Sequence, residues 1–282
     1  MAELHGRVAL VTGASRGIGK GVAQALGAAG ATVYVTGRTE RPEDASVPLP
    51  GTIHETARAV TELGGAGIAV RCDHGDDAQV AALFERIQAE QGRLDILVNN
   101  AWGGYQAMQR GEPGFQTAFW KLPPEFWDSM HTVGVRSAYV ASVWAARLMV
   151  ARRSGLIANI SYMAGEKYTS NVAYGVAKAA VDRMARDMAY ELRKTNVAVV
   201  SIWPNTVRTE MIAKRQDANL KVSGGVMPYV ESPQFVGRGI AALAADPAVM
   251  AKSGQILGTR ELAIEYGFSD IDGTRPKPIK RR

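Results

Sequence analysis

Short apolar segments rich in Val and Ile alternate with longer helical patterns along nearly the whole chain. Most of these segments lack an apolar–polar alternation, which is typical of parallel strands covered by helices on both faces. We therefore predict an α/β fold with a single doubly wound parallel sheet and helices on both faces. The predicted strands are Val8–Thr12, Thr32–Thr36, Gly67–Cys72, Ile96–Asn99, Gly155–Ser161, Ala198–Trp203 and Gln255–Leu257. The predicted helices are Gly17–Ala29, Ile53–Leu63, Asp77–Gln91, Glu125–Ala151, Tyr174–Lys194 and Pro233–Ala244.

The length and composition fit one globular domain over residues 1–282. With 282 residues, 46% of them hydrophobic and 21% charged, the chain can bury a core without disulfides or metal ions. Its one cysteine, Cys72, cannot form an intramolecular disulfide, which fits a reducing compartment. The N-terminus lacks the pattern of a signal peptide, and no apolar stretch is long enough to span a bilayer. We expect a cytoplasmic protein with no membrane partner.

The formal net charge of +6 comes partly from the end of the chain. Residues 274–282 contain lysines and arginines interrupted by prolines, which indicates a flexible basic tail rather than a helix. Basic residues do not cluster with aromatic residues elsewhere, so we expect no nucleic-acid partner. The four histidines lack metal-ligand spacing, so we expect no metal site.

Two stretches interrupt the alternation of strands and helices. Arg41–Gly51 carries three prolines and is predicted to be a surface loop. Trp102–Pro124 follows the fourth predicted strand and is rich in glycine and aromatic residues. Loops at the carboxyl ends of parallel strands line the ligand crevice of such sheets. The second stretch is therefore a candidate wall or lid of a pocket, with a packed surface loop as the alternative.

A glycine-rich turn joins the first predicted strand to the first predicted helix. Gly13 permits a tight turn out of the strand, Gly17 lets the backbone approach a phosphate group, and Gly19 lets the helix pack against the strand. The helix N-terminus attracts the negative charge of such a group. The spacing Gly-x-x-x-Gly-x-Gly differs from the commoner dinucleotide fingerprint, but its position between strand and helix is the required one. We interpret the turn as a dinucleotide-binding loop, with an ordinary glycine-rich turn as the alternative.

The end of the second predicted strand indicates which dinucleotide is bound. Residues 33–39 include no acidic side chain that could accept hydrogen bonds from the ribose diol of NAD(H). They include Arg38 instead, and Arg16 lies in the glycine loop. A guanidinium binds a 2′-phosphate through two charge-assisted hydrogen bonds. The sequence therefore favours NADP(H), with NAD(H) as the second possibility and solvated surface arginines as the alternative interpretation.

Tyr174 and Lys178 lie four residues apart in a predicted helix, so their side chains share one face. An ammonium held near a phenol favours the phenolate and lowers the pKa of the phenol from about 10. Such a phenol can exchange the proton that accompanies hydride transfer at a carbonyl. Tyr190 and Lys194 have the same spacing, but only Tyr174 follows a residue, Ser161, whose hydroxyl ends a predicted strand at the carboxyl edge of the sheet. The first pair is therefore the predicted catalytic one, and the second is a packed tyrosine beside a solvated lysine.

The glycine loop, an Asn-Asn-Ala segment at residues 99–101, Ser161 and the Tyr174–Lys178 pair occur in this order. Together they resemble the short-chain dehydrogenase/reductase family from about residue 7 to residue 257. That family has a one-domain Rossmann-like fold, uses NAD(P)(H) and commonly forms dimers or tetramers. The resemblance implies that Tyr174 is the catalytic acid/base and that Ser161 polarises the carbonyl. It also implies that Lys178 lowers the pKa of the tyrosine and hydrogen-bonds the nicotinamide ribose.

The same resemblance implies a set of cofactor-binding residues. Asp73 would contact adenine, and the segment after the sixth predicted strand would hold the nicotinamide. The complete set is Gly13, Ser15, Arg16, Gly17, Ile18, Gly19, Arg38, Asp73, Asn99, Ala101, Tyr174, Lys178, Pro204, Val207 and Thr209.

Several positions depart from the family pattern. Trp102 and Asn205 stand where the family usually has glycine. The helical asparagine of the usual catalytic tetrad is expected near residue 133, where the chain has Val133. Another proton route is therefore predicted, through the Thr132 hydroxyl or through backbone carbonyls. The Val133-Gly134 pair and residues 261–268 resemble the subgroup of dehydrogenase/reductase member 1.

These features predict hydride transfer between the nicotinamide of NAD(P)(H) and a bulky apolar small molecule that carries a carbonyl or alcohol group. The alternative is a catalytically weak protein of the same fold that senses dinucleotides or serves a structural role. The absent asparagine favours this alternative, whereas the intact Ser161, Tyr174 and Lys178 oppose it. The resemblance also implies a homodimer or homotetramer. Aromatic and sulfur-containing side chains would form the substrate pocket, namely Trp102, Tyr105, Tyr162, Met163, Tyr168 and Met211.

Overall fold

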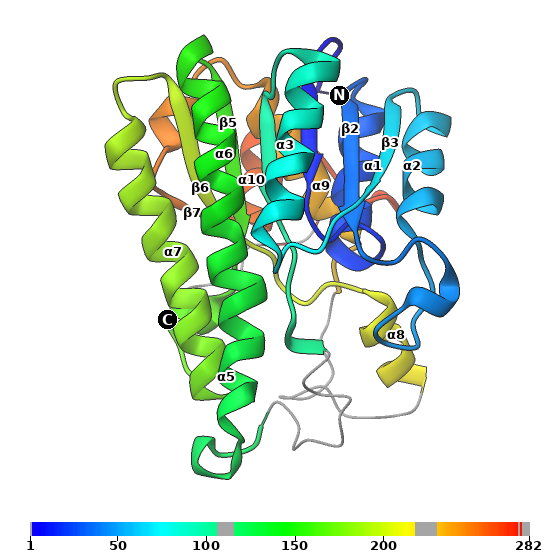
Figure 1. Ribbon diagram of the computed structural model, residues 1–282, viewed down its shortest axis with the longest axis vertical. Coiled ribbons are helices and arrows are strands. Elements are labelled where there is room, and N and C mark those ends of the chain that lie inside the picture. Colours follow the sequence, from blue (N-terminus) through cyan, green and yellow to red (C-terminus); the bar gives the residue numbers. More distant parts are fainter. Residues whose placement is uncertain (1, 106–115, 218–229, 276, 278–282) are drawn as a thin grey trace.

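Seven strands form one parallel sheet in the order β3-β2-β1-β4-β5-β6-β7 (Figure 1). The computed structural model describes residues 2–105, 116–217, 230–275 and 277. Leu10 in the central strand pairs with Tyr34 on one side and with Leu97 on the other. The predicted doubly wound α/β fold is therefore confirmed. The strands are β1 (Val8–Val11), β2 (Thr32–Gly37), β3 (Ala66–Arg71), β4 (Ile96–Asn99), β5 (Gly155–Ile160), β6 (Val197–Trp203) and β7 (Ile256–Gly258).

Helices cover both faces of the sheet and enclose two apolar cores (Figure 1). Because neighbouring residues of a strand face opposite sides, β5 contributes Ala158 to the first core and Ile157 to the second. The first core is covered by α1 (Gly17–Ala28), α2 (Ile53–Glu62), α9 (Pro233–Ala245) and α10 (Thr259–Tyr266). The second is covered by α3 (Asp77–Gln91), α6 (Ser137–Arg152) and α7 (Val172–Leu192).

The region predicted as one helix over Glu125–Ala151 is broken near its start. α5 (Pro124–His131) leads into a π-helical turn over Thr132–Arg136, and α6 follows. Val133 has φ −107° and ψ 81°, which are not helical, and its carbonyl accepts a hydrogen bond from Gly103 N at 2.7 Å. The prediction of a continuous helix is wrong, because the segment after β4 binds a carbonyl that a straight helix would use internally.

Two helices of eight residues each, α8 (Glu210–Asp217) and α10, are absent from the prediction. Two turns are too few to show a repeated apolar period. α7 begins two residues earlier than predicted because Asn171 caps it, its side-chain oxygen accepting a hydrogen bond from Tyr174 N at 2.9 Å. This cap fixes the first turn of the helix that carries Tyr174 and Lys178.

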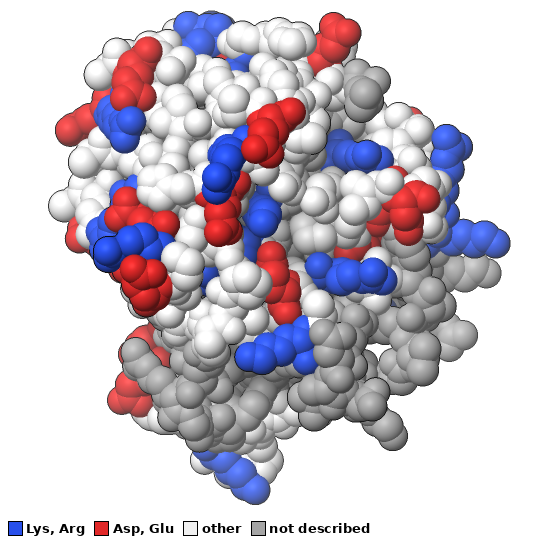
Figure 2. Space-filling view, turned by 90° about the vertical axis from the view of Figure 1, so that its right-hand side faces the viewer, with Lys and Arg blue, Asp and Glu red and all other residues white. Residues whose placement is uncertain are grey.

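The surface carries both signs of charge. On the face shown in Figure 2, Lys and Arg side chains of the described residues are interspersed with Asp and Glu rather than forming one continuous basic area. Among the described helices, none combines the length and the apolar character that crossing a bilayer requires. The predicted basic tail lies largely outside the described residues; within it, the carbonyl of Lys277 accepts a hydrogen bond from Arg260 Nη1 at 3.0 Å.

Candidate active site

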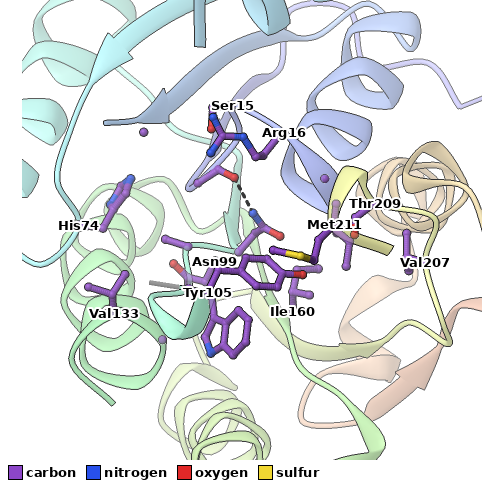
Figure 3. A pocket seen from close by; sticks show the side chains of 18 of the residues that line it. Ser15, Arg16, His74, Asn99, Tyr105, Val133, Ile160, Val207, Thr209 and Met211 are labelled. Atoms are coloured by element: carbon purple, nitrogen blue, oxygen red, sulfur yellow. Dashed lines mark hydrogen bonds between the residues drawn. The ribbon is translucent and has the colours of Figure 1, made fainter. Parts of the chain in front are cut away.

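A cavity of about 390 Å³ lies at the carboxyl edge of the sheet. Its walls come from the segments that follow β1 to β6, together with α7, α8 and the turn between α5 and α6. In Figure 3, Ser15 and Arg16 lie on one side, Thr209 on a second, and His74 and Val133 on a third. This is the edge at which open α/β sheets bind ligands.

The glycine loop forms a backbone cradle at this edge. Gly13 has a φ of +65°, and a Cβ on it would lie 2.7 Å from the Cα of Ala101. Gly17 has a φ of +58° and begins α1, where its N–H donates to Glu210 Oε2 at 2.9 Å. This carboxylate stands in for the phosphate oxygen that a helix N-terminus favours. The bare backbone and an N–H that already binds an anionic oxygen therefore fit the pyrophosphate of a dinucleotide.

Asn100 ties the glycine loop to the end of β4. Its Nδ2 donates to the carbonyls of Thr12 and Gly13 at 2.9 Å each, and its backbone N–H donates to Thr12 Oγ1 at 2.9 Å. Gly19 does not line the cavity but packs against this amide, since a Cβ on it would lie 2.4 Å from Asn100 Nδ2. The sequence motif includes Asn100, but only the fold shows that it fastens two strand ends together.

Apart from Gly19, the predicted cofactor residues are brought together around the cavity. Asp73 follows β3, and its carboxylate lies 3.6 Å from the guanidinium of Arg38. The side chain of Asn99 is buried and donates to Ser142 Oγ and Asn159 Oδ1 at 2.9 and 2.8 Å, which ties it into the sheet. The lining residues of this set are Gly13, Ser15, Arg16, Gly17, Ile18, Arg38, Asp73, Asn99, Ala101, Tyr174, Lys178, Pro204, Val207 and Thr209.

The two arginines of the cofactor prediction are held differently. Arg16 Nε donates to the carbonyl of Pro50 at 3.1 Å, and its Nη2 donates to the carbonyl of Gly51 at 2.8 Å. Arg38 makes a longer contact with Ser46 Oγ, at 3.4 Å, and its side chain is 36% exposed. Arg38 is therefore less constrained than Arg16 and can turn toward an anionic ligand.

The segment predicted as a surface loop, Arg41–Gly51, forms part of the cavity wall. Val47 and Leu49 are buried, and both line the cavity together with Ser46. The prolines predicted an irregular segment correctly, but the tertiary fold turns its apolar side chains inward.

Tyr174 and Lys178 both line the cavity from α7. Lys178 Nζ donates to the carbonyl of Ile160 at 3.1 Å and lies 5.7 Å from the centre of the Tyr174 ring. Burial lowers the pKa of Lys178 from 10.5 to about 8, and the carboxylate of Asp182 opposes this shift. The pair expected from the sequence is therefore brought together, with an ammonium that burial makes easier to deprotonate.

The pKa of Tyr174 is raised above its ordinary value of 10, mainly by burial and further by the neighbouring Tyr162 and Tyr105. This direction is opposite to the predicted lowering of the phenol pKa by Lys178. Loss of water around the phenol outweighs the effect of an ammonium that lies 5.7 Å from the ring centre. The chain by itself thus holds Tyr174 protonated, as a proton donor requires.

Ser161 belongs to a buried polar cluster beneath α7. It is 3% exposed, and its Oγ donates to the carbonyl of Lys178 at 3.2 Å. Asp182 accepts hydrogen bonds from Ser201 Oγ at 2.5 Å and from Trp203 Nε1 at 3.0 Å. Burial raises the pKa of Asp182, while its bonds with Ser201, Trp203 and Ser161 lower it. The role of Ser161 in polarising a carbonyl stays a prediction.

The predicted substrate residues are only partly brought together. Trp102 packs edge to face against Tyr105 and Tyr174, with ring centroids 4.9 and 5.8 Å apart. Met163 does not line the cavity, and Tyr168, on the segment before α7, is 77% exposed. Residues 106–115 of the predicted pocket wall lie outside the described residues. The members of the set that line the cavity are Trp102, Tyr105, Tyr162 and Met211.

The kink between α5 and α6 supplies further lining. Val133 and Gly134 reach the cavity, whereas Thr132 is exposed and does not line it. The predicted proton route through Thr132 therefore lacks support from the geometry, because the turn directs the next two residues inward instead. Among the described residues, no three His, Cys, Asp or Glu side chains gather as a metal site would require.

A buried carboxylate that no sequence motif indicated fixes the segment after β6. Glu231 is fully buried and accepts hydrogen bonds from Asn205 Nδ2 at 2.6 Å, Thr259 Oγ1 at 2.7 Å and Arg260 Nε at 2.9 Å. These partners lie in separate parts of the chain, so only the tertiary structure brings them together. Glu231 thus positions the segment that begins at Pro204 and forms one wall of the cavity.

Comparisons with known proteins agree with this geometry. The family model for short chain dehydrogenases matches residues 7–220. The chain is 43% identical to mouse (Mus musculus) dehydrogenase/reductase SDR family member 1, over 99% of this chain and 87% of that protein. It is 41% identical to the protein of that name from Homo sapiens, over 96% of this chain and 85% of the relative.

Solved structures share the fold over most of their length. A 7 alpha-hydroxysteroid dehydrogenase complexed with NADH and 7-oxo glycochenodeoxycholic acid is similar with a TM-score of 0.73 and 27% identity, covering 98% of this chain and 97% of that one. A metagenomic short-chain oxidoreductase in complex with NADP is similar with a TM-score of 0.67 and 29% identity, covering 86% of this chain and 92% of that one.

The Asp182 cluster leads to a stability prediction. Asp182→Ala removes the acceptor of the buried Ser201 and Trp203 donors, which should lower the free energy of unfolding by about 1–3 kcal/mol. Asp187→Ala, in the same helix, breaks only an exposed pair with Arg183 and should cost less than about 0.5 kcal/mol. Urea unfolding of both variants measures the difference. Equal losses in the two variants would contradict a structural role for the Asp182 cluster.

Proposed function

This chain belongs to the short-chain dehydrogenase/reductase family and is an NAD(P)-dependent oxidoreductase acting on CH–OH or C=O groups. We propose that it interconverts a bulky apolar ketone and its alcohol with NADP(H). Tyr174 is the acid/base of this proposed reaction. The observation that carries the proposal is the meeting of Tyr174 and Lys178 in an aromatic-lined cavity next to the glycine loop. When bound, the dinucleotide supplies or accepts the hydride.

The chain's own residues donate the proton and stabilise the charge that remains. In the reducing direction, the Tyr174 phenol gives its proton to the carbonyl oxygen as the carbonyl carbon gains a hydride, and a phenolate remains. The Lys178 ammonium stabilises that phenolate, and it is held in place by the carbonyl of Ile160 at 3.1 Å. The high pKa of Tyr174 in the chain alone keeps the proton in place until then.

The substrate class follows from the cavity walls. Trp102, Tyr105 and Met211 line the cavity and offer large apolar surfaces, and two of them surround Tyr174 or its neighbour with aromatic rings. Such walls bind through apolar contact and leave orientation to a small number of polar groups. A relative 31% identical over 74% of this chain is the Escherichia coli 7alpha-hydroxysteroid dehydrogenase, which supports a bulky, mainly apolar substrate.

The residues that would hold the dinucleotide also support a preference for NADP(H). Gly13 and Gly17 offer backbone to the pyrophosphate, and Arg16 and Arg38 supply positive charge beside the end of β2. Asp73 lies 3.6 Å from Arg38 and tempers this charge, so NAD(H) remains usable in the proposal. The proposal also includes a cytoplasmic location. It further includes a homodimer or homotetramer, as is common in the family.

Tyr174→Phe should lower kcat for NADPH-dependent reduction of trifluoroacetophenone by about 10²–10⁴-fold, because only the acidic proton is lost. The Kd for NADPH should stay within about twofold of the wild type. Tyr190→Phe removes an exposed phenol of the same helix and should leave both quantities unchanged. Activity that survives the first change but not the second would reverse the assignment. A wild type that binds NADPH but reduces no ketone would favour the sensor alternative.

The pKa of Lys178 predicts the alkaline limb of the pH profile. Because kcat/KM for NADPH reports ionisations of the free enzyme, it should fall about tenfold per pH unit above about pH 8, as Lys178 loses its proton. Tyr174 stays protonated through this range because its pKa is raised. Lys178→Arg keeps the charge and should lose this limb, at a lower overall rate. A wild-type profile that stays flat well above pH 8 would contradict the prediction.

Arg38→Ala should weaken the binding of NADPH but not the binding of NADH. One charged hydrogen bond is worth about 1.5–3 kcal/mol, so kcat/KM for NADPH should fall roughly ten- to a hundredfold. NADH has no 2′-phosphate, so its kcat/KM should hardly change. Steady-state kinetics with both dinucleotides in the wild type and the variant test this. A wild type that prefers NADH, or a variant that loses both equally, would refute the NADP(H) preference.

A further inference from the structure

The N-terminus of α1 holds an anionic group that comes from the chain itself. Gly17, the first residue of α1, donates its backbone N–H to Glu210 Oε2 at 2.9 Å. The two residues are distant in the sequence, because Glu210 begins α8, which follows β6. Both line the cavity. The contact therefore places a carboxylate in the part of the cavity that the proposed function assigns to the pyrophosphate of the dinucleotide.

A carboxylate and a phosphate group compete for this position. The first N–H groups of a helix have no partner within the helix and carry partial positive charge, so they attract anions. A pyrophosphate oxygen at the glycine loop would accept from the same N–H of Gly17. A Cβ on Gly17 would lie 3.8 Å from Glu210 Oε2, so the carboxylate lies against the bare backbone that a phosphate would approach. Glu210 and the pyrophosphate thus exclude each other from this N–H.

The charge of Glu210 adds to the competition. Burial lowers the pKa of the Arg16 guanidinium, whereas the carboxylates of Glu210 and Glu55 oppose this shift. Glu210 therefore offsets part of the positive charge that the glycine loop offers to a ligand. Among the residues that the structure describes, no donor other than Gly17 forms a hydrogen bond with its carboxylate. Because a carboxylate can accept several hydrogen bonds, one held through a single bond is readily exchanged for a stronger anion.

We propose that Glu210 is an internal competitor of the dinucleotide, which occupies the Gly17 N–H until the pyrophosphate displaces it. This inference rests on the proposed function, since it takes the glycine loop as the pyrophosphate site. Glu210 lowers the affinity for the dinucleotide and is not one of its ligands. Met211 follows Glu210 in α8 and lines the cavity, so the exchange breaks a hydrogen bond between α1 and the helix that carries Met211.

The test replaces Glu210 and measures the binding of NADPH by isothermal titration calorimetry. Glu210→Ala removes the competing carboxylate, so the Kd for NADPH should fall about tenfold, the effect of one hydrogen bond to a charged group. Glu210→Gln keeps an acceptor oxygen without the charge, so its Kd should lie between those of the wild type and Glu210→Ala. NADH has the same pyrophosphate and should gain by the same factor. Glu62→Ala removes an exposed carboxylate at the end of α2 and should bind both dinucleotides like the wild type.

Melting temperatures give a second measurement that does not depend on turnover. The bond between Gly17 and Glu210 stabilises the wild type only while no pyrophosphate binds there. Without a dinucleotide, Glu210→Ala should therefore melt about 2–4 °C below the wild type. At saturating NADPH this difference should shrink, because both proteins then lack the bond.

The outcomes that overturn the inference differ from those that overturn the proposed function. A Kd for NADPH that is unchanged or weaker in Glu210→Ala would show that Glu210 does not compete with the dinucleotide. A difference in melting temperature that persists at saturating NADPH would show that Glu210 keeps its bond in the complex. Either result leaves the proposed function standing. If neither the wild type nor Glu210→Ala binds NADPH or NADH, the proposed function fails and this inference fails with it.

Discussion

Two hydrogen bonds between α7 and the end of β5 hold the proposed catalytic centre together. Lys178 Nζ donates to the carbonyl of Ile160, and the carbonyl of Lys178 accepts from Ser161 Oγ. Because one bond uses the side chain of Lys178 and the other its backbone, the helix can neither rotate nor slide against the strand without breaking one of them. The positions of Tyr174 and Tyr162 relative to each other follow from this junction.

Two buried carboxylates also stabilise the region around α7 and the segment after β6. Their loss of hydration is offset by hydrogen bonds from several donors. Asp182 lies beneath α7 with Ser201 and Trp203 as donors, and Glu231 lies behind the segment after β6 with three donors, one of them the guanidinium of Arg260. A buried carboxylate is tolerated when its oxygens are well satisfied. Each of these two carboxylates joins elements that are distant in sequence and so fixes part of the cavity wall.

Two departures from the family pattern, Trp102 and Val133, lie on the same wall of the cavity as Tyr174. Trp102 packs edge to face against Tyr105 and Tyr174, and the kink after α5 places Val133 at the wall where a polar side chain is usual. On the side of the glycine loop, Gly13 and Gly17 expose bare backbone, and Asn100 ties this loop to the end of β4. In the proposed function, the cavity therefore combines a glycine-rich cradle for a dinucleotide with an aromatic wall beside Tyr174. In such a surrounding a hydrogen bond to a developing charge is stronger than in water.

The sequence by itself determined the seven strands, the doubly wound sheet, the glycine loop and the Tyr174–Lys178 pair, because short-range periodicity and fixed spacing carry that information. It predicted neither the break at Val133 nor the helices α8 and α10, since a competing hydrogen bond and a two-turn helix leave no periodic pattern. The place of Ser161 at the end of a strand was also predicted from the sequence, whereas the hydrogen bond of its hydroxyl to the Lys178 carbonyl depends on how α7 packs on β5. The Asp182 and Glu231 clusters were decided by tertiary structure alone, because their donors are separated in sequence and meet only when the strand ends come together at one edge of the sheet.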